Sequence, residues 1–191
     1  MEDFIKYIRN SIAVKEAILT DENFLINFEK LVNKSVNCIN NGGKIFFCGN
    51  GGSAADAQHI AAELTGKFLQ DRQPIAAIAL GTNFSYTTAV ANDYSYDNLF
   101  SRELQALAKA DDILIGISTS GNSANVMNAI KTANQIGLLT SAWTGKNGGN
   151  IKNIVDIWLG IPTDFTPHIQ EAHITIGHAF CYFIERKLSI N

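Results

Sequence analysis

Residues 44–53 read Lys-Ile-Phe-Phe-Cys-Gly-Asn-Gly-Gly-Ser, a short apolar run that ends in a glycine-rich turn. The run is too short for a typical helix and too continuously apolar for a strand with one exposed face, so it predicts a strand buried on both faces. A helical pattern follows directly, from residue 53 to residue 68. A buried strand, a glycine turn and a helix in this order are typical of a parallel sheet covered by helices.

The same alternation continues along the chain. Apolar runs at 74–80, 112–118, 138–143 and 154–161 predict further buried strands, and helical patterns at 97–109 and 123–136 lie between them. The sequence therefore predicts an α/β fold in which helices cover both faces of a parallel sheet. A last pattern at 167–187 opens with Pro167, which suits the first turn of a helix, and predicts one long helix.

Residues 1–42 show helical periodicity ahead of the first strand. Asp21 is suited to cap the start of a helix and Gly42-Gly43 to end one. These helices have no strand of their own to cover, so we expect them to pack against the sheet edge or a second subunit, and the low charge favours the second subunit. Because no repeat or linker interrupts the sequence, we assign residues 1–191 to a single domain, with N-terminal helices at 1–42 and an α/β core at 43–191.

The composition excludes several classes of protein. With 46% hydrophobic and 17% charged residues, the 191-residue chain is a globular domain large enough to bury its own core. A net charge of −3, with no cluster of Lys and Arg, argues against nucleic acid as a partner. The N-terminus lacks the apolar core of a secretory signal, and the uncharged stretches are too polar to span a membrane, so we expect a cytoplasmic protein. Three cysteines without a CxxC pair predict buried, reduced thiols.

Two loops follow predicted strands, at the edge of a parallel sheet where ligands bind. The second of them, residues 118–123, reads Ser-Thr-Ser-Gly-Asn-Ser and offers four hydroxyls ahead of a predicted helix. Hydroxyls and free N–H groups at a helix N-terminus suit a phosphate group. Capping the helix needs one residue, Asn122 or Ser123, and leaves the other hydroxyls unexplained. The loop therefore predicts a phosphate site.

The first loop, residues 49–54, fits the permissive dinucleotide fingerprint G-x-G-x-x-A. A dinucleotide site also needs an acidic residue at the end of the second strand, where this chain has Ala79-Leu80-Gly81-Thr82. The missing acid argues against a nucleotide-dependent oxidoreductase.

His59 and Glu63 lie four residues apart, on one face of the helix that follows the glycine loop. Such a pair can bind a divalent metal or act as an acid/base couple, but it also occurs as a solvated surface ion pair, and both interpretations remain open. The last helix adds a group of similar side chains among which spacing cannot choose: His168, Gln170, Glu171, His173 and His178. A lone histidine there is more often a buried core group or a helix-end cation.

Asn92 and Asp93 follow a predicted short helix after the second strand. Their side chains could bind sugar hydroxyls. They also suit a turn or a helix cap, and on sequence alone this structural interpretation is favoured over sugar binding.

Together these motifs resemble the sugar isomerase (SIS) domain family, and within it the bacterial phosphoheptose isomerases. The resemblance runs over nearly the whole chain and is carried by Cys48-Gly-Asn-Gly-Gly-Ser53, His59 with Glu63-Leu-Thr-Gly66, Asn92-Asp93, Phe100-Ser-Arg102, residues 116–125, Thr144-Gly-Lys146 with Gly148-Gly149, and Ile169-Gln-Glu with His178. Small departures are Lys67, where Arg is frequent, and Thr166-Pro-His168, where an Asp-Arg pair can stand.

The resemblance implies a flavodoxin-like three-layer sandwich with a five-stranded parallel sheet, and a homotetramer packed through the N-terminal helices with active sites at subunit interfaces. It implies isomerisation of D-sedoheptulose 7-phosphate to D-glycero-D-manno-heptose 7-phosphate through an enediol. That reaction is the first step of heptose supply for lipopolysaccharide core or capsule. It also implies one zinc ion per subunit.

Matching positions carry the family's roles onto this sequence. The substrate would be bound by Asn50, Gly51, Gly52, Ser53, Glu63, Asn92, Asp93, Ser118, Thr119, Ser120, Ser123 and Gln170. Zinc would be bound by His59, Glu63, Gln170 and His178. Glu63 is the expected base and His178 the expected acid or ring-opening group. The alternative is a non-catalytic SIS protein, either a replication-initiator-binding homologue or a sugar-phosphate sensor. The intact metal set favours the enzyme.

Overall fold

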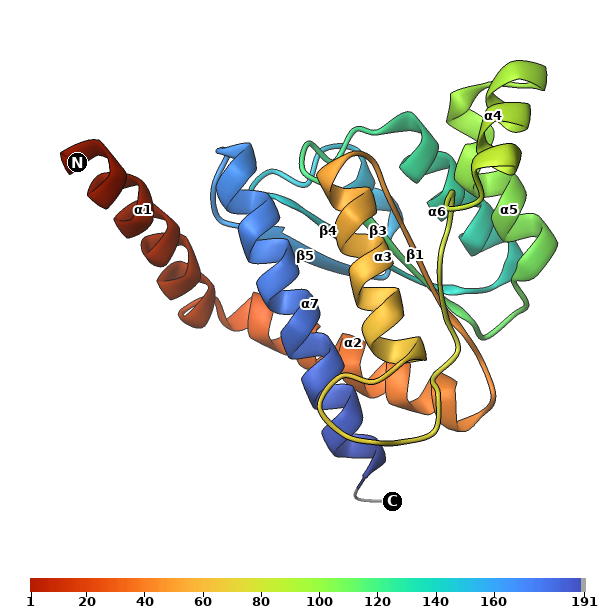
Figure 1. The fold of residues 1–191 in the computed structure, drawn as a ribbon, viewed down its shortest axis with the longest axis horizontal. Helices are drawn as coiled ribbons and strands as arrows, with labels where there is room; N and C mark the ends of the chain where they lie inside the picture. Colours follow the sequence, from red (N-terminus) through yellow and green to blue (C-terminus); the bar gives the residue numbers. More distant parts are fainter. Residues whose placement is uncertain (190–191) are drawn as a thin grey trace.

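The computed structural model describes residues 1–189, and these residues form a five-stranded parallel sheet between helices (Figure 1). The strand order is β2-β1-β3-β4-β5. The strands are β1 (Ile45–Gly49), β2 (Ala77–Ala79), β3 (Ile113–Ser118), β4 (Leu139–Gly145) and β5 (Ile157–Ile161). Each of the five predicted strands is present, and the α/β sandwich expected from the resemblance is confirmed.

Side chains of the central strands alternate between two apolar cores, one on each face of the sheet. In β1, Ile45 and Phe47 belong to one core, and Phe46 and Cys48 belong to the other. Every residue of β1 and β3 is buried. Burial on both faces explains why these strands read as continuous apolar runs rather than as alternating patterns.

Helices α2 (Glu22–Asn40), α3 (Gly52–Thr65) and α7 (Thr166–Leu188) cover one face of the sheet. Helices α4 (Phe84–Asp93), α5 (Leu99–Leu107) and α6 (Ala124–Ile136) cover the other. Two short 3-10 turns, η1 (Tyr96–Asn98) and η2 (Ile151–Ile154), complete the description. Figure 1 shows α3 and α7 lying side by side on the same face, and this neighbourhood builds the site described below.

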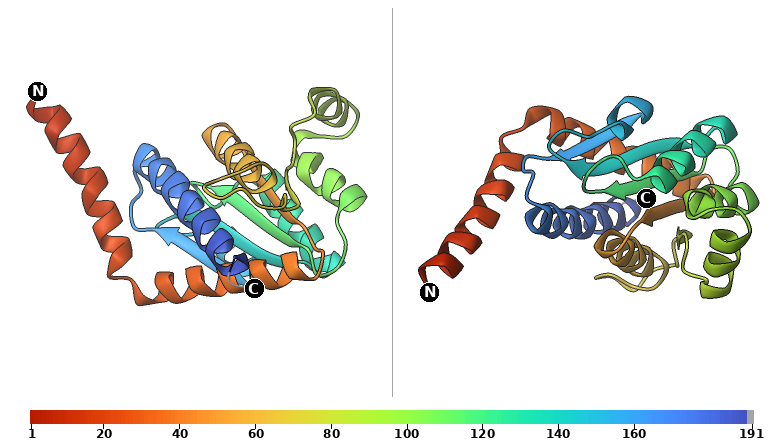
Figure 2. Two further views of the ribbon diagram at one scale, coloured as in Figure 1. Left: turned by 60° about the horizontal axis from the view of Figure 1, so that its bottom comes forward. Right: turned by 90° about the horizontal axis from the view of Figure 1, so that it is seen from above.

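The N-terminal region forms two helices, α1 (Glu2–Leu19) and α2, as the periodicity predicts. The Asp21 carboxylate accepts a hydrogen bond from the Phe24 N–H at 3.0 Å, which confirms the predicted cap, and α2 ends just before Gly42. Helix α2 packs on α7 and on the edge strand β5, which confirms the sheet-edge alternative for this helix, while packing against a second subunit remains a prediction. Helix α1 instead projects away from the sheet (Figure 2).

Asn92 and Asp93 are the last two residues of α4, whereas the sequence placed them after a helix. Among the described residues, all three cysteines are buried and free, as expected. Burial raises the pKa of Cys48 to about 12, which keeps its thiol protonated and inert. Within residues 1–189, no helix combines the length and the apolar character that crossing a membrane requires.

Candidate functional site

The two loops singled out in the sequence leave the sheet side by side. Strands β1 and β3 pair in parallel, with Gly49 opposite Ile117, so the glycine loop and the Ser/Thr loop begin at neighbouring positions. Each loop leads directly into a helix, α3 or α6. The arrangement brings two helix N-termini to the carboxyl edge of the sheet, which is the usual ligand-binding edge of such folds.

The Ser/Thr loop folds into a tight turn whose hydroxyls face one another. The Gly121 N–H donates to the Ser118 carbonyl at 3.0 Å, and the hydroxyl oxygens of Ser118 and Ser123 lie 2.9 Å apart. Ser123 occupies the cap position of α6, but within the described chain its side chain makes no capping hydrogen bond. The Asn122 side-chain oxygen accepts from the Asn150 N–H instead. Helix capping therefore explains none of the loop's hydroxyls.

Gly148 and Gly149, in the segment after β4, pack against this turn. Gly121 has a φ of +66°, and a side chain there would collide with the backbone of Gly148 and Gly149. The Ile151 N–H donates to the Gly121 carbonyl at 3.1 Å. A cavity of about 210 Å³ lies between the Ser/Thr loop and the segment that follows β4, with Thr119, Ser120 and Lys146 among its lining residues. The loop is thus held in a fixed shape.

In the glycine loop, Asn50 is held by two side chains that the sequence did not single out. Asn50 donates to the Asn125 side-chain oxygen at 2.9 Å, and Asn125 donates back at 2.8 Å. The Tyr96 hydroxyl donates to the Asn50 side-chain oxygen at 2.8 Å. Both partners are distant in sequence, so no local spacing could have indicated them.

Gln170 lies against the first turn of α3. A side chain at Gly52 would come within 2.6 Å of the Gln170 amide nitrogen, so it would displace the end of the Gln170 side chain. Gly51, the cap residue of α3, has a φ of +56°, and Ser53 is buried in the first turn. Gln170 therefore faces the start of the helix that carries His59 and Glu63.

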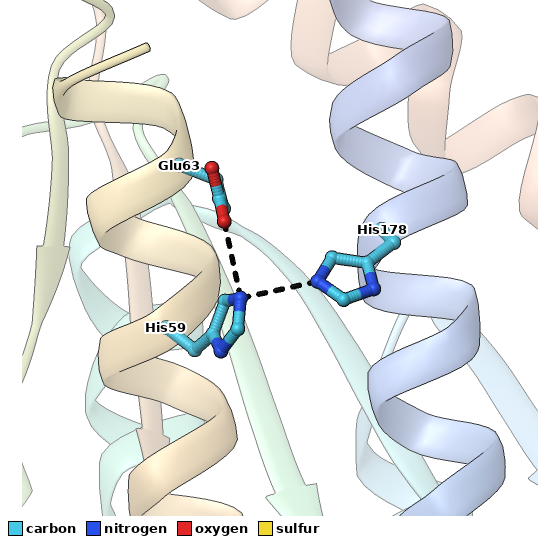
Figure 3. Close-up of side chains that lie close together, drawn as sticks. All are labelled: His59, Glu63 and His178. Carbon is cyan, nitrogen blue, oxygen red and sulfur yellow. Dashed lines mark hydrogen bonds and ion pairs between the residues drawn. The ribbon is translucent and has the colours of Figure 1, made fainter. Parts of the chain in front are cut away.

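His59, Glu63 and His178 converge between α3 and α7 (Figure 3). The His59 Nε2 atom lies 3.1 Å from a Glu63 carboxylate oxygen and 3.1 Å from the His178 Nε2 atom. The side chain of His59 is 47% exposed and that of Glu63 is 25% exposed, so the cluster is open to a ligand. The structure thus joins the i, i+4 pair to one member of the α7 group, across 119 positions of sequence.

The chemistry of this cluster fits a divalent metal. The His59 Nε2 atom faces both the Glu63 carboxylate and the His178 Nε2 atom, and a single hydrogen on it can serve only one of them fully. A cation at the meeting point would serve all three groups. Ligand atoms at the usual 2.0–2.1 Å from a tetrahedral zinc stand about 3.3 Å apart, close to the two contacts seen here. Gln170 as a fourth ligand remains a prediction.

The other two histidines of α7 are core groups. His173 is fully buried and contacts the Thr144 carbonyl through Nε2 at 3.3 Å. Burial lowers the pKa of His173 to about 4, so the ring is neutral. His168 packs edge-on between Tyr7 and Phe165. For both residues the core interpretation was correct.

Asp56 lies one turn before His59 on α3 and was not among the candidates. One of its carboxylate oxygens is buried without a hydrogen-bond partner among residues 1–189. Burial raises the pKa of Asp56 to about 6, and the charge of nearby His59 partly offsets the rise. A carboxyl group poised in this way beside the cluster is typical of a functional site.

Asn92 and Asp93 lie on the exposed end of α4, where the Asn92 amide donates to the Asp93 carboxylate at 2.7 Å. They are not members of the His59, Glu63 and His178 cluster found in the described chain. Their expected role in binding substrate remains a prediction.

Comparison with known proteins identifies the family. A family model described as SIS domain matches residues 6–145, more than half of the chain. The chain belongs to the SIS domain family. Its relatives include the phosphoheptose isomerase of Clostridium acetobutylicum, 48% identical over 189 residues that cover 98% of this chain and 96% of the relative. The phosphoheptose isomerase of Aneurinibacillus thermoaerophilus is 46% identical over 192 residues, covering 100% of this chain and 97% of the relative.

Solved structures agree with this membership. The phosphoheptose isomerase from Neisseria gonorrhoeae matches this SIS domain with a TM-score of 0.91 and 41% identity, over 97% of this chain and 98% of that chain. The phosphoheptose isomerase from Francisella tularensis matches with a TM-score of 0.92 and 34% identity, over 97% of both chains. The resemblance to phosphoheptose isomerases is confirmed across nearly the whole SIS domain.

Proposed function

We propose that this chain is an aldose–ketose isomerase that converts D-sedoheptulose 7-phosphate to D-glycero-D-manno-heptose 7-phosphate. The observation that carries the proposal is the convergence of His59, Glu63 and His178 beside α3, the helix that starts at the carboxyl edge of the sheet. The same edge holds the Ser/Thr loop, whose hydroxyls are not used for capping. The full-length relatives named phosphoheptose isomerase support the substrate class.

The reaction moves a carbonyl group from C2 to C1 of the sugar, so a proton must leave C1 and return to C2. The Glu63 carboxylate is the base that takes the C1 proton and gives it back to C2 of the enediol. His178 gives a proton to the C2 oxygen and accepts one from the C1 oxygen. The contact between the His59 and His178 rings supports this assignment, because His59 also lies 3.1 Å from the Glu63 carboxylate.

Zinc is the proposed cofactor, held by His59, Glu63, Gln170 and His178. When bound, it would supply positive charge that stabilises negative charge on the substrate oxygens. A carboxylate that binds a metal is a weaker base. In this proposal Glu63 therefore acts as a metal ligand in one state and as the base in another.

The phosphate group would be bound at the N-terminus of α6 and the sugar hydroxyls along the glycine loop. The proposed substrate-binding residues are Asn50, Gly51, Gly52, Ser53, Glu63, Asn92, Asp93, Ser118, Thr119, Ser120, Ser123 and Gln170. The fixed turn of the Ser/Thr loop supports this assignment, since a preformed set of donors binds an anion without an ordering cost.

The proposal includes a cytoplasmic homotetramer that supplies heptose for lipopolysaccharide core or capsule. Helix α1 supports the assembly, because Phe4, Ile5, Ile8 and Ile12 are all at least 41% exposed on it. An apolar helix face of this kind is typical of a subunit interface. The alternative function, a non-catalytic SIS protein, would not need the three convergent side chains.

Incubation with sedoheptulose 7-phosphate, with and without a chelator, tests the proposal. We expect an aldoheptose phosphate to form, and to form much more slowly after chelation. Unphosphorylated sedoheptulose is the matched control, and it should be a poor substrate because the Ser/Thr loop has nothing to bind. No aldoheptose under either condition would favour the non-catalytic alternative.

A further inference from the structure

The loop between α3 and β2 is tied to the end of α7 by one buried carboxylate. Glu185 is 1% exposed and accepts hydrogen bonds from three successive backbone N–H groups of the loop. The donors are Phe68 at 3.3 Å, Leu69 at 3.1 Å and Gln70 at 3.2 Å. A side chain seven residues after His178 on α7 therefore fixes the path of a loop that leaves α3.

Arg72, from the same loop, joins this carboxylate to the end of α3. Its Nε atom donates to Glu185 at 2.9 Å. Its other two nitrogens donate to the backbone carbonyls of Glu63 at 2.9 Å and Leu64 at 2.8 Å. The last carbonyls of a helix lack partners within the helix, and the last turn of α3 contains no basic residue of its own. Arg72 thus caps the end of α3 at the backbone of Glu63, the proposed base.

Phe68 connects the same loop to the proposed acid. The Phe68 ring is stacked on the imidazole of His178, with 5.8 Å between ring centroids and 18° between planes. The ring is half-buried and also packs on the apolar core beneath α3 and α7. Because Glu185 holds the Phe68 backbone, it also determines where this ring lies against His178.

We propose that Glu185 is a positioning residue for the isomerisation. Acting through Arg72 and Phe68, it holds Glu63 and His178 at the separation that the proton transfer needs. The inference rests on the proposed function for its activity readout, but the geometry it predicts is measurable without activity.

A contribution to stability does not by itself explain the buried ion pair of Arg72 and Glu185. Removing two charges from water costs free energy, and apolar side chains of similar volume often stabilise a protein as well or better. The Glu185 carboxylate and its hydrogen-bond donors, called here the Glu185 clamp, fix the orientation of their partners. An apolar contact does not, because only hydrogen bonds have a direction. Here those directions converge on the two elements that carry the proposed base and acid.

The test compares Glu185→Gln with a matched variant, Asp112→Asn. Asp112 is 2% exposed, pairs with Lys44 and accepts from the backbone N–H groups of Lys44 and Lys109, but it lies at the amino end of β3, opposite the site. In each variant an amide NH₂ meets N–H donors, so both should lower the melting temperature. Only Glu185→Gln should also lower kcat, by about 10- to 100-fold, with KM unchanged because the phosphate loop is untouched.

A second pair of variants tests the link through Phe68 without disturbing the buried charges. Phe68→Leu keeps an apolar side chain but removes the flat ring, so it should lower kcat. Phe68→Tyr keeps the ring and should have a kcat close to that of the wild-type chain. A crystal structure of Glu185→Gln should show a changed distance between the Glu63 carboxylate and the His178 Nε2 atom.

The outcomes separate the two proposals. An inactive wild-type chain contradicts the proposed function, and the positioning role is then decided by the crystal structure alone. If Glu185→Gln lowers the melting temperature as Asp112→Asn does, but leaves kcat and the distance between Glu63 and His178 unchanged, Glu185 is a structural residue and the inference is wrong.

Discussion

The Nε2 atoms of His59 and His178 lie 3.1 Å apart, although the two residues are 119 positions apart in sequence. The contact exists because α3 and α7 cover the same face of the sheet and pack directly on each other. Glu63 reaches the same His59 atom from one turn further along α3. The proposed base, the proposed acid and the proposed metal ligands thus meet at one point between α3 and α7.

Glu63→Gln should abolish isomerisation while the fold and sugar-phosphate binding persist. The amide keeps the size of the side chain but cannot take a proton from carbon, and loss of a general base typically costs about 10²–10⁴-fold in rate. Steady-state kinetics measures the rate, and the rise in melting temperature on adding sugar phosphate measures binding. Glu29→Gln, on the exposed surface of α2, is the control and should be fully active. An active Glu63→Gln enzyme would remove Glu63 as the base.

Ser123→Ala should weaken substrate binding without destabilising α6. Its hydroxyl lies 2.9 Å from that of Ser118 and does not cap the helix in the described structure, so a stability loss of about 1 kcal/mol, typical of a lost cap, is not expected. A lost hydrogen bond to a phosphate should raise KM about tenfold or more. Asp21→Ala is the converse control, since its carboxylate does cap α2. It should lose about 1 kcal/mol and keep its KM. Equal KM values for the two variants would argue against phosphate binding by Ser123.

Local sequence predicted the parts of this molecule that depend on local chemistry. The five strands and the cap at Asp21 follow from apolar runs and turn residues a few positions apart. Local sequence did not show which α7 histidine belongs to the site. His173 and His178 differ only in which face of the helix they lie on, and the fold decides which face meets the core. The Glu185 clamp was equally invisible, since its partners lie more than 110 positions away.

Asp56→Asn should stabilise the protein at neutral pH. Burial raises the pKa of Asp56 from 3.8 to about 6, so the folded state binds this proton more tightly than the unfolded state does. The resulting stabilisation is present below pH 3.8 and is lost as the pH rises through 6. Above that window the wild-type chain holds a partly buried charge, and its removal should increase the free energy of unfolding by about 1–2 kcal/mol. Urea denaturation at pH 5 and pH 8 measures the difference. An equal effect at both pH values would show that Asp56 does not titrate as described.

His173 should make the fold sensitive to mild acid. Its Nε2 atom contacts the Thr144 carbonyl and therefore carries the hydrogen, while Nδ1 is buried without a partner among residues 1–189. Protonation would place an unpaired charge at Nδ1, which explains why burial lowers the pKa of this ring from 6.5 to about 4. Between these values the unfolded state binds more protons than the folded state, so stability falls as the pH is lowered. Lowering the pH from 7.5 to 5 should cost wild-type protein about 2 kcal/mol more than it costs His173→Gln, which keeps a donor for Thr144 but does not titrate. Urea denaturation of both proteins at the two pH values measures this difference, and parallel losses would contradict the assignment of His173 as a neutral buried ring.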